Sequence, residues 1–125
     1  MKKRVGLDYI TSAIAARKMK LVLEKRPRFY KFGVDNYGEI PGFINPADND
    51  PWDVIVAGYP KLPVNVEFPI KKLKGVFMLP NGNHKLIVDV ECGSRYNQNK
   101  FEKELKRYEK NYNKFTKMRG CIVLF

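Results

Sequence analysis

The sequence predicts an α+β domain that is mainly β: a small OB-like antiparallel barrel or twisted sheet with one long amphipathic helix at its C-terminal end. Two observations lead to this prediction. Between residues 52 and 90, short apolar runs alternate with turns rich in Gly, Pro and Asn, which is typical of short strands. After residue 100, apolar residues recur at helical spacing. The 125 residues, 44% of them hydrophobic, fit a single domain over 1–125 with a core of its own.

The N-terminal third carries the weaker structural signals. Asp8 is a candidate N-cap for an N-terminal helix over residues 10–21. Residues 20–24 also have the pattern of a strand, so both alternatives stay open there. A second short strand is expected over 28–32. Residues 36–51 are rich in Gly, Pro, Asn and Asp, and we expect them to form a loop.

The central third predicts four strands. Strand-like runs cover residues 52–57, 64–68 and 75–79. Pro80-Asn-Gly-Asn83 has the composition of a tight turn, so the third run is expected to form a hairpin with a fourth strand over 84–90.

The C-terminal segment predicts an amphipathic helix of some five turns. Its apolar residues are spaced 4, 3, 4 and 3 apart, which places them on one helical face. Asn99 and Glu102 can form a capping box at its start, and Gly120 suits its end. Residues 121–125 are expected to form a closing strand or a tail packed on the core. The apolar face consists of Phe101, Leu105, Tyr108, Tyr112 and Phe115, and the opposite face carries Lys103, Lys106, Arg107, Lys110, Lys114 and Lys117.

Composition excludes several classes of protein. The longest fully apolar run is the five residues 121–125, whereas a membrane-spanning helix needs about 20. The basic N-terminus is not followed by the apolar region of a secretory signal. Two cysteines, Cys92 and Cys121, are too few for a disulfide scaffold. We therefore expect a cytoplasmic protein with reduced thiols and no membrane partner.

The net charge of +11 is unevenly distributed along the chain. Residues 1–32 hold ten Lys and Arg against two acids, and residues 92–125 hold nine against three. Residues 33–56 hold five acids and no Lys or Arg. Basic ends suit an anionic partner such as nucleic acid, and the acidic centre suits a cation.

Three carboxylates of the acidic centre lie within six residues. Asp48, Asp50 and Asp53 immediately precede and enter the strand predicted over 52–57. Oxygen ligands that converge in this way suit Mg²⁺. A loop stabilised by Asx turns explains the same spacing without a metal, and spacing alone leaves both interpretations open.

Four segments in order resemble the core of the family I soluble inorganic pyrophosphatases. They are Asn36-Tyr-Gly-Glu-Ile-Pro41, Asp48-Asn-Asp-Pro-Trp-Asp-Val-Ile-Val56, Leu73-Lys-Gly-Val-Phe77 and Lys85-Leu-Ile-Val-Asp-Val90. The family carries N-Y-G-x-I-P, D-x-D-P-x-D-V-x-V, P-x-G-V and K-L-I-x-V segments at similar spacing. The resemblance covers residues 32–90 and, loosely, the C-terminal helix.

The resemblance implies a set of site residues. It makes Asp48, Asp50 and Asp53 ligands of Mg²⁺, with Asp50 and Asp53 catalytic. It places an arginine close to the phosphates, which would be Arg28 or Arg26. Tyr37 could equally pack in the core. The residues that it assigns to substrate phosphate are Tyr37, Lys85, Arg28 and Tyr112.

The chain also departs from the family pattern. The family has two further metal-binding acids in the loop before Lys85, where this chain has Asn81, Gly82 and Asn83. The paired Glu of the family's N-terminal hairpin has no clear counterpart, and Glu24 is the nearest candidate. His84, the only histidine, follows the predicted turn and is expected to be exposed.

Two functions follow as alternatives. The first is Mg²⁺-dependent hydrolysis of a phosphoanhydride, either pyrophosphate or a pyrophosphate-bearing nucleotide, by metal-activated water. The second is a catalytically inactive module of the same fold that binds nucleic acid or a partner protein through its basic surface. Either protein could assemble as a homo-oligomer.

Overall fold

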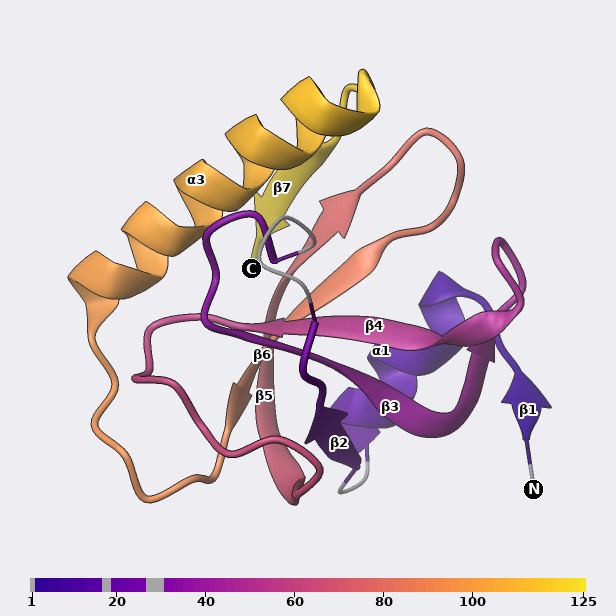
Figure 1. The fold of residues 1–125 in the computed structure, drawn as a ribbon. Helices are drawn as coiled ribbons and strands as arrows, with labels where there is room; N and C mark the ends of the chain where they lie inside the picture. The colour runs from indigo at the N-terminus through magenta and orange to yellow at the C-terminus, as the bar shows by residue number, and fades with distance from the viewer. Residues whose placement is uncertain (1, 17–18, 27–30) are drawn as a thin grey trace.

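Five strands close into a barrel in the computed structural model, which describes residues 2–16, 19–26 and 31–125. Neighbouring strands of the barrel are hydrogen-bonded to one another. Figure 1 shows how the strands and helices are arranged. The fold is α+β and mainly β, with 38% strand and 25% helix, which confirms the predicted class. In order around the barrel the strands are β3 (Asn36–Asn45), β2 (Lys20–Leu23), β5 (Glu67–Met78), β6 (Lys85–Val90) and β4 (Asp50–Val56), which returns to β3.

The barrel is antiparallel except at one pair. β4 and β6 run parallel, with Val54 opposite Leu86. Two short strands extend the sheet: β1 (Lys3–Arg4) runs parallel to β3, and β7 (Cys121–Leu124) runs antiparallel to β5. The predicted closing strand over 121–125 is therefore confirmed as β7.

Two clusters of buried side chains lie on opposite faces of the strands. Strand β4 shows why, because successive side chains of a strand point to opposite faces. Trp52 and Val54 belong to a cluster that includes Ile10 of helix α1 (Leu7–Ala16). Ile55 belongs to a second cluster, which includes Tyr108 of helix α3 (Gln98–Thr116). The candidate site described below lies on the α3 side.

Helix α3 confirms the predicted C-terminal helix and corrects its ends. The N-cap is Asn97, whose side chain accepts a hydrogen bond from the Lys100 amide at 2.9 Å, so Asn99 lies inside the first turn. The C-cap is Lys117 in the left-handed conformation, at φ 59°. Gly120 has another role, since a Cβ there would lie 2.5 Å from the Phe77 ring. Four residues of the predicted apolar face are buried, whereas Phe115 is 60% exposed.

In the N-terminal third, residues 20–24 could be either the end of a helix or a strand, and the structure decides between the two. Helix α1 begins at Leu7, so Asp8 lies in its first turn and is not the N-cap. The helix ends at Ala16, and residues 20–23 form strand β2. In the strand expected over 28–32, residues 28–30 lie outside the described residues, and Lys31 and Phe32 are not in a strand.

The loop expected over 36–51 was the largest error. Its first ten residues form β3, which pairs with β2 and β4. Strand β2 passes so close to Gly38 that no side chain fits there, because a Cβ would lie 2.1 Å from the Val22 carbonyl oxygen. The pairing with β4 is irregular between Ile40 and Ile44, where Gly42 takes a φ of 86°. Glycine and proline here mark a bulge within a strand, which composition alone reads as loop.

The run predicted over 75–79 lies within strand β5 except for residue 79, whereas the run predicted over 64–68 shares only residues 67 and 68 with that strand. Bulges between Ile70 and Lys72 and between Leu73 and Gly75 bend this strand, so it can pair with both β2 and β6. The strands predicted over 52–57 and 84–90 correspond to β4 and β6. Within the described residues, no helix is both long and apolar enough to span a membrane.

Candidate functional site

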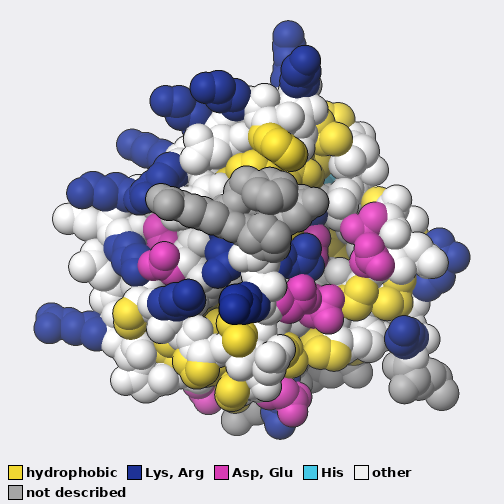
Figure 2. Space-filling view, in the orientation of Figure 1, with side chains coloured by type: hydrophobic (Ala, Val, Ile, Leu, Met, Phe, Trp, Pro, Cys, Tyr) yellow, Lys and Arg dark blue, Asp and Glu magenta, His cyan; other side chains and the backbone are white. Residues whose placement is uncertain are grey.

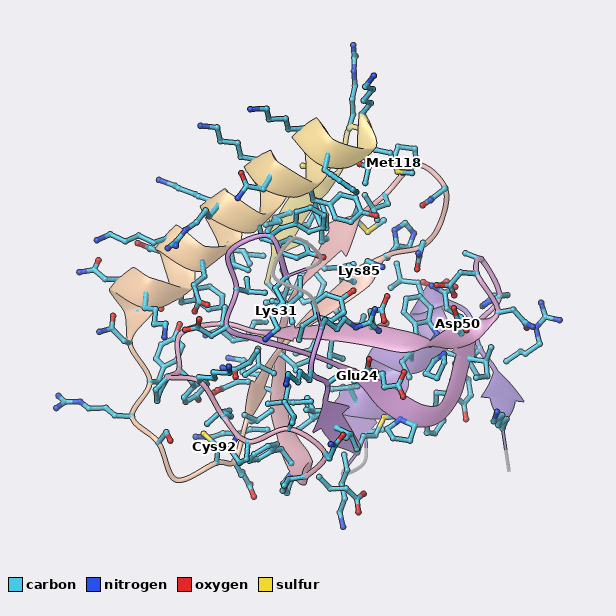
Figure 3. All side chains as sticks on the ribbon, in the orientation of Figure 1. Glu24, Lys31, Asp50, Lys85, Cys92 and Met118 are labelled. Carbon is cyan, nitrogen blue, oxygen red and sulfur yellow. The ribbon has the colours of Figure 1, made fainter. Side chains whose placement is uncertain are left out.

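A polar cavity of about 420 Å³ opens between strands β3, β4 and β6 and helix α3. Figure 3 shows Lys85 at the start of β6 and Asp50 at the start of β4 around this region. Arg28 lies outside the described residues, and Arg26 lines the cavity instead. All six other predicted site residues line this one cavity: Tyr37, Asp48, Asp50, Asp53, Lys85 and Tyr112.

The strand register explains this convergence. Asp53 of β4 lies directly opposite Glu39 of β3, and Tyr37 lies opposite Ile55. Tyr37 and Glu39 are two residues apart, so their side chains point to the same face of the sheet. Lys85 begins the strand on the other side of β4. Three neighbouring strands thus contribute polar side chains to a single face.

Asp53 is the electrostatic centre of the cavity. Its Oδ2 lies 2.6 Å from Lys85 Nζ, and both side chains are nearly buried, at 11% and 6% exposed. Its Oδ1 lies 3.7 Å from Arg26 Nη2. Arg26 also pairs with Glu24 at 2.9 Å. Both oxygens of the Asp53 carboxylate therefore face cations of the protein itself.

Asp48 and Asp50 lie at the mouth of the cavity in a tight loop. Asp48 Oδ1 accepts a hydrogen bond from the Asp50 amide at 3.1 Å, and Asn45 Oδ1 accepts one from Ala47. Asn49 between them takes a φ of 60°. These are the Asx turns of the alternative interpretation, and they leave both carboxylates exposed beside the cavity.

The carboxylates do not form a ready metal centre. Among the described residues, no group of three His, Cys, Asp or Glu side chains is placed to hold a metal ion. Lys85 and Arg26 face the Asp53 carboxylate, and a backbone amide occupies Asp48 Oδ1. The donor atoms are hard oxygens of the kind that Mg²⁺ prefers. The set therefore fits Mg²⁺ in chemistry, and assembling it requires Asp53 to exchange its cation partners.

Glu39 is a functional candidate that the sequence analysis missed. It lines the cavity and shares a hydrogen bond with the Glu24 carboxyl. Partial burial, together with this contact, raises the pKa of Glu39 to about 7. The available signal was the two-residue spacing from Tyr37, which becomes visible only when residues 36–45 are recognised as a strand.

Aromatic side chains form the wall of the cavity on the α3 side. Tyr37 stacks on Tyr108, and Tyr108 on Tyr112, with ring centroids 6.3 and 5.8 Å apart. The Arg26 guanidinium lies over the Tyr37 ring at 5.0 Å. Burial raises the pKa of Tyr37 well above its usual value, and the nearby charge of Asp53 adds to the effect. Burial also raises the pKa of Tyr112, so both hydroxyls remain protonated and can donate hydrogen bonds.

His84 holds the turn before Lys85. It was expected to be exposed, but it is half-buried. Its Nδ1 accepts a hydrogen bond from the Leu79 amide at 2.9 Å. Burial and the neighbouring Lys85 lower the pKa of His84. Of the two asparagines in this turn, Asn83 lines the cavity, whereas Asn81 accepts a hydrogen bond from the Asn83 amide.

Glu104 positions helix α3 beside the cavity, and nothing in the sequence pattern singled it out. The residue is 1% exposed. Its carboxylate accepts hydrogen bonds from the amides of Asp35 and Gly58, both at 2.9 Å. Burial raises the pKa of Glu104. Glu104 of α3 is thereby hydrogen-bonded to both the segment before β3 and the segment after β4.

Comparisons with known proteins add no relative to this picture. No protein-family model matches the chain, and neither a curated protein nor a solved structure matches it. The interpretation of the cavity therefore depends on its geometry and on the sequence motifs.

Proposed function

We propose that this protein is a Mg²⁺-dependent phosphoanhydride hydrolase of the inorganic pyrophosphatase type, acting on pyrophosphate or on a pyrophosphate-bearing nucleotide. One observation carries the proposal. Three of the four segments supply Tyr37, Asp48, Asp50, Asp53 and Lys85, and the C-terminal helix supplies Tyr112. All six line one cavity although they come from β3, β4, β6, α3 and the loop before β4.

Lys85 and Arg26 are the groups proposed to bind phosphate. Both are cations that line the cavity, and without a ligand both face Asp53. A phosphate group offers them a stronger, more highly charged acceptor. When Lys85 and Arg26 turn to the phosphate, they release the carboxylate of Asp53.

Asp53, once released, completes the donor set for Mg²⁺ with Asp48 and Asp50. Bound Mg²⁺ lowers the pKa of a coordinated water and offsets the charge that develops on the phosphates. The residues of this chain contribute position and charge: Asp48 and Asp50 at the mouth, Lys85 and Arg26 at the floor. Tyr112 reaches the cavity from α3 as a hydrogen-bond donor.

The pairing of Asp53 with Lys85 is compatible with the proposal, although the described residues contain no ready metal centre. An isolated carboxylate that is nearly buried is costly, so a ligand-free cavity is more stable when Asp53 is paired. The observed Asp53–Lys85 pair at 2.6 Å is therefore what a resting cavity of this kind requires.

Phosphate release from pyrophosphate in the presence of Mg²⁺ tests the proposal. We expect turnover that depends on Mg²⁺ and falls at least ~100-fold in Asp53→Asn, which keeps the shape of the side chain and removes its charge. Asp8→Asn is the matched control, since Asp8 is an exposed carboxylate on α1. The proposal is wrong if no Mg²⁺-dependent release occurs, or if Asp53→Asn and Asp8→Asn release phosphate equally.

A further inference from the structure

The outer face of helix α3 carries cations that the proposed hydrolysis does not use. We call Lys103, Lys106, Arg107, Lys110 and Lys114 the basic face. At 3.6 residues per turn, these five side chains fall within a sector of about 100°. The sector lies opposite the four buried apolar residues of the same helix, Phe101, Leu105, Tyr108 and Tyr112. Figure 2 shows Lys and Arg side chains projecting along the edge of the molecule where α3 lies.

The charge of the basic face is not neutralised within the protein. All five side chains are exposed, and none of them takes part in an ion pair within residues 2–16, 19–26 and 31–125. The nearest acids on α3 have other partners: Glu109 accepts a hydrogen bond from the Ile122 amide, and Glu102 accepts one from Gln98. Like charges three and four residues apart repel, so this arrangement destabilises the free helix.

We propose that the basic face binds the sugar–phosphate backbone of a nucleic acid. Lys103 and Lys114 are separated by roughly 16 Å along the helix axis at about 1.5 Å per residue. Along the axis of a duplex, this length spans about five base pairs at roughly 3.4 Å each. The face offers ammonium and guanidinium groups, and their contacts to the phosphates of the backbone carry no sequence information. Binding is therefore independent of sequence.

A nucleic acid fits this face better than an anionic membrane does. A helix that binds a membrane surface inserts its apolar side between the lipids. The apolar side of α3 is packed against the barrel, where Phe101 and Tyr108 are 3% and 1% exposed. Phe115 is the exception on the apolar face, at 60% exposed, so α3 offers a lipid surface one apolar side chain and not a continuous apolar face.

The basic face and the cavity lie on different sides of the same helix. Tyr108 and Tyr112 line the cavity, whereas no residue of the basic face does. Nucleic-acid binding and hydrolysis can therefore be tested, and can fail, separately.

Two triple variants with the same change in net charge test the inference. The first is Lys106→Gln, Lys110→Gln and Lys114→Gln on the basic face. The second is Lys20→Gln, Lys61→Gln and Lys71→Gln, which removes three exposed lysines from other elements. Binding of fluorescent single-stranded and duplex oligonucleotides of unrelated sequences is measured by anisotropy across a salt series. Circular dichroism and thermal unfolding verify that both variants fold.

We expect the wild type to bind every sequence similarly, with an affinity that falls steeply with salt. The basic-face variant should lose roughly tenfold or more in affinity. Its slope against salt should become shallower by about 0.9 for each lysine that contacts a duplex phosphate. The control variant should lose much less, and both variants should hydrolyse pyrophosphate as the wild type does. Equal losses in the two variants, no binding to either oligonucleotide, or binding to phosphatidylserine vesicles in preference to nucleic acid would overturn the inference.

Discussion

The cavity and the outer face of α3 hold charge in opposite ways. At the cavity, carboxylates and cations alternate at short distances: Arg26, Asp53 and Lys85 line it, Glu24 lies beside Arg26, and the contacts between them are 2.6 to 3.7 Å. On the outer face, charges of one sign stand side by side in water. The same chain thus contains a compensated cluster inside and an uncompensated one outside.

The two regions differ in how strongly a single charged residue interacts with its neighbours. A charge shielded from water interacts strongly with each neighbour, so a single substitution in the cavity should have a large effect that salt hardly changes. Exposed charges are screened within about 8 Å at physiological salt, so only several of them together should matter. The predictions below test this contrast, beginning with the largest expected effect.

Lys85→Met should destabilise the protein by about 2 kcal/mol, because it leaves Asp53 nearly buried without its closest cation. Arg26 at 3.7 Å limits the loss. Lys100→Met is the matched comparison, since Lys100 pairs with Asp35 at 2.7 Å in an exposed position. That substitution should cost less than about 1 kcal/mol. Urea unfolding of both variants measures the two effects.

The double variant Asp53→Asn/Lys85→Met serves as the control. Removing both charges should recover most of the stability lost in Lys85→Met, since no uncompensated charge remains. Equal costs for Lys85→Met and Lys100→Met would show that burial does not distinguish the two ion pairs.

Glu104→Ala should destabilise the protein by about 2 kcal/mol, because the amides of Asp35 and Gly58 lose their acceptor under α3. Glu104→Gln should cost less, since its amide oxygen can still accept one of these hydrogen bonds. Glu102→Ala, an exposed position on the same helix, is the control and should stay within about 0.5 kcal/mol. Thermal unfolding of the three variants would contradict this interpretation if their midpoints agreed.

Local patterns predicted the fold class, and the family resemblance named six residues that line the cavity. Alternating apolar residues predicted β4 and β6, and the helical spacing predicted α3. The D-x-D-P-x-D segment assigned Asp48, Asp50 and Asp53, which line the cavity. Features that depend on residues close together in the sequence, such as one strand or one helix face, can be predicted from the sequence.

The errors have a common physical cause, which is pairing between distant segments. Residues 36–45 form a strand because Gly38 allows β2 to approach, and nothing near Gly38 in the sequence reports this contact. Glu39 was missed with that strand. Glu104 was missed because the amides that it accepts from lie 69 and 46 residues away. The pairing of Asp53 with Lys85 likewise joins two strands that meet only in the folded barrel.

Glu39→Gln should make stability less dependent on pH. The pKa of Glu39 is raised from 4.5 to about 7 in the folded protein, so the unfolded chain ionises first as the pH rises. Stability should therefore fall between about pH 4.5 and 7 and then level off. Glu39→Gln should remove this loss and stabilise the protein at pH 8 relative to wild type, but not at pH 4.5. The effect should be on the order of 1 kcal/mol, because solvent screens this partly exposed carboxyl.

Denaturant unfolding of wild type and Glu39→Gln across this pH range is the measurement. Glu67→Gln, at an exposed carboxyl that begins β5, should leave the pH profile as it is in wild type. A profile for Glu39→Gln that runs parallel to that of wild type would show that Glu39 is not the group responsible.

Neutralising the basic face should have the smallest effect on stability and the opposite sign. Lys106→Gln, Lys110→Gln and Lys114→Gln together remove repulsion between neighbours, each pair of which costs roughly 0.2–0.5 kcal/mol in an isolated helix. We expect the triple variant to be as stable as wild type or slightly more stable, with the gain largest at about 0.01 M salt and absent at about 1 M. The cost of Lys85→Met should be the same at both salt concentrations. If the triple variant is instead destabilised at low salt, the lysines stabilise α3 through contacts within the protein. Their charge would then be explained without an anionic partner.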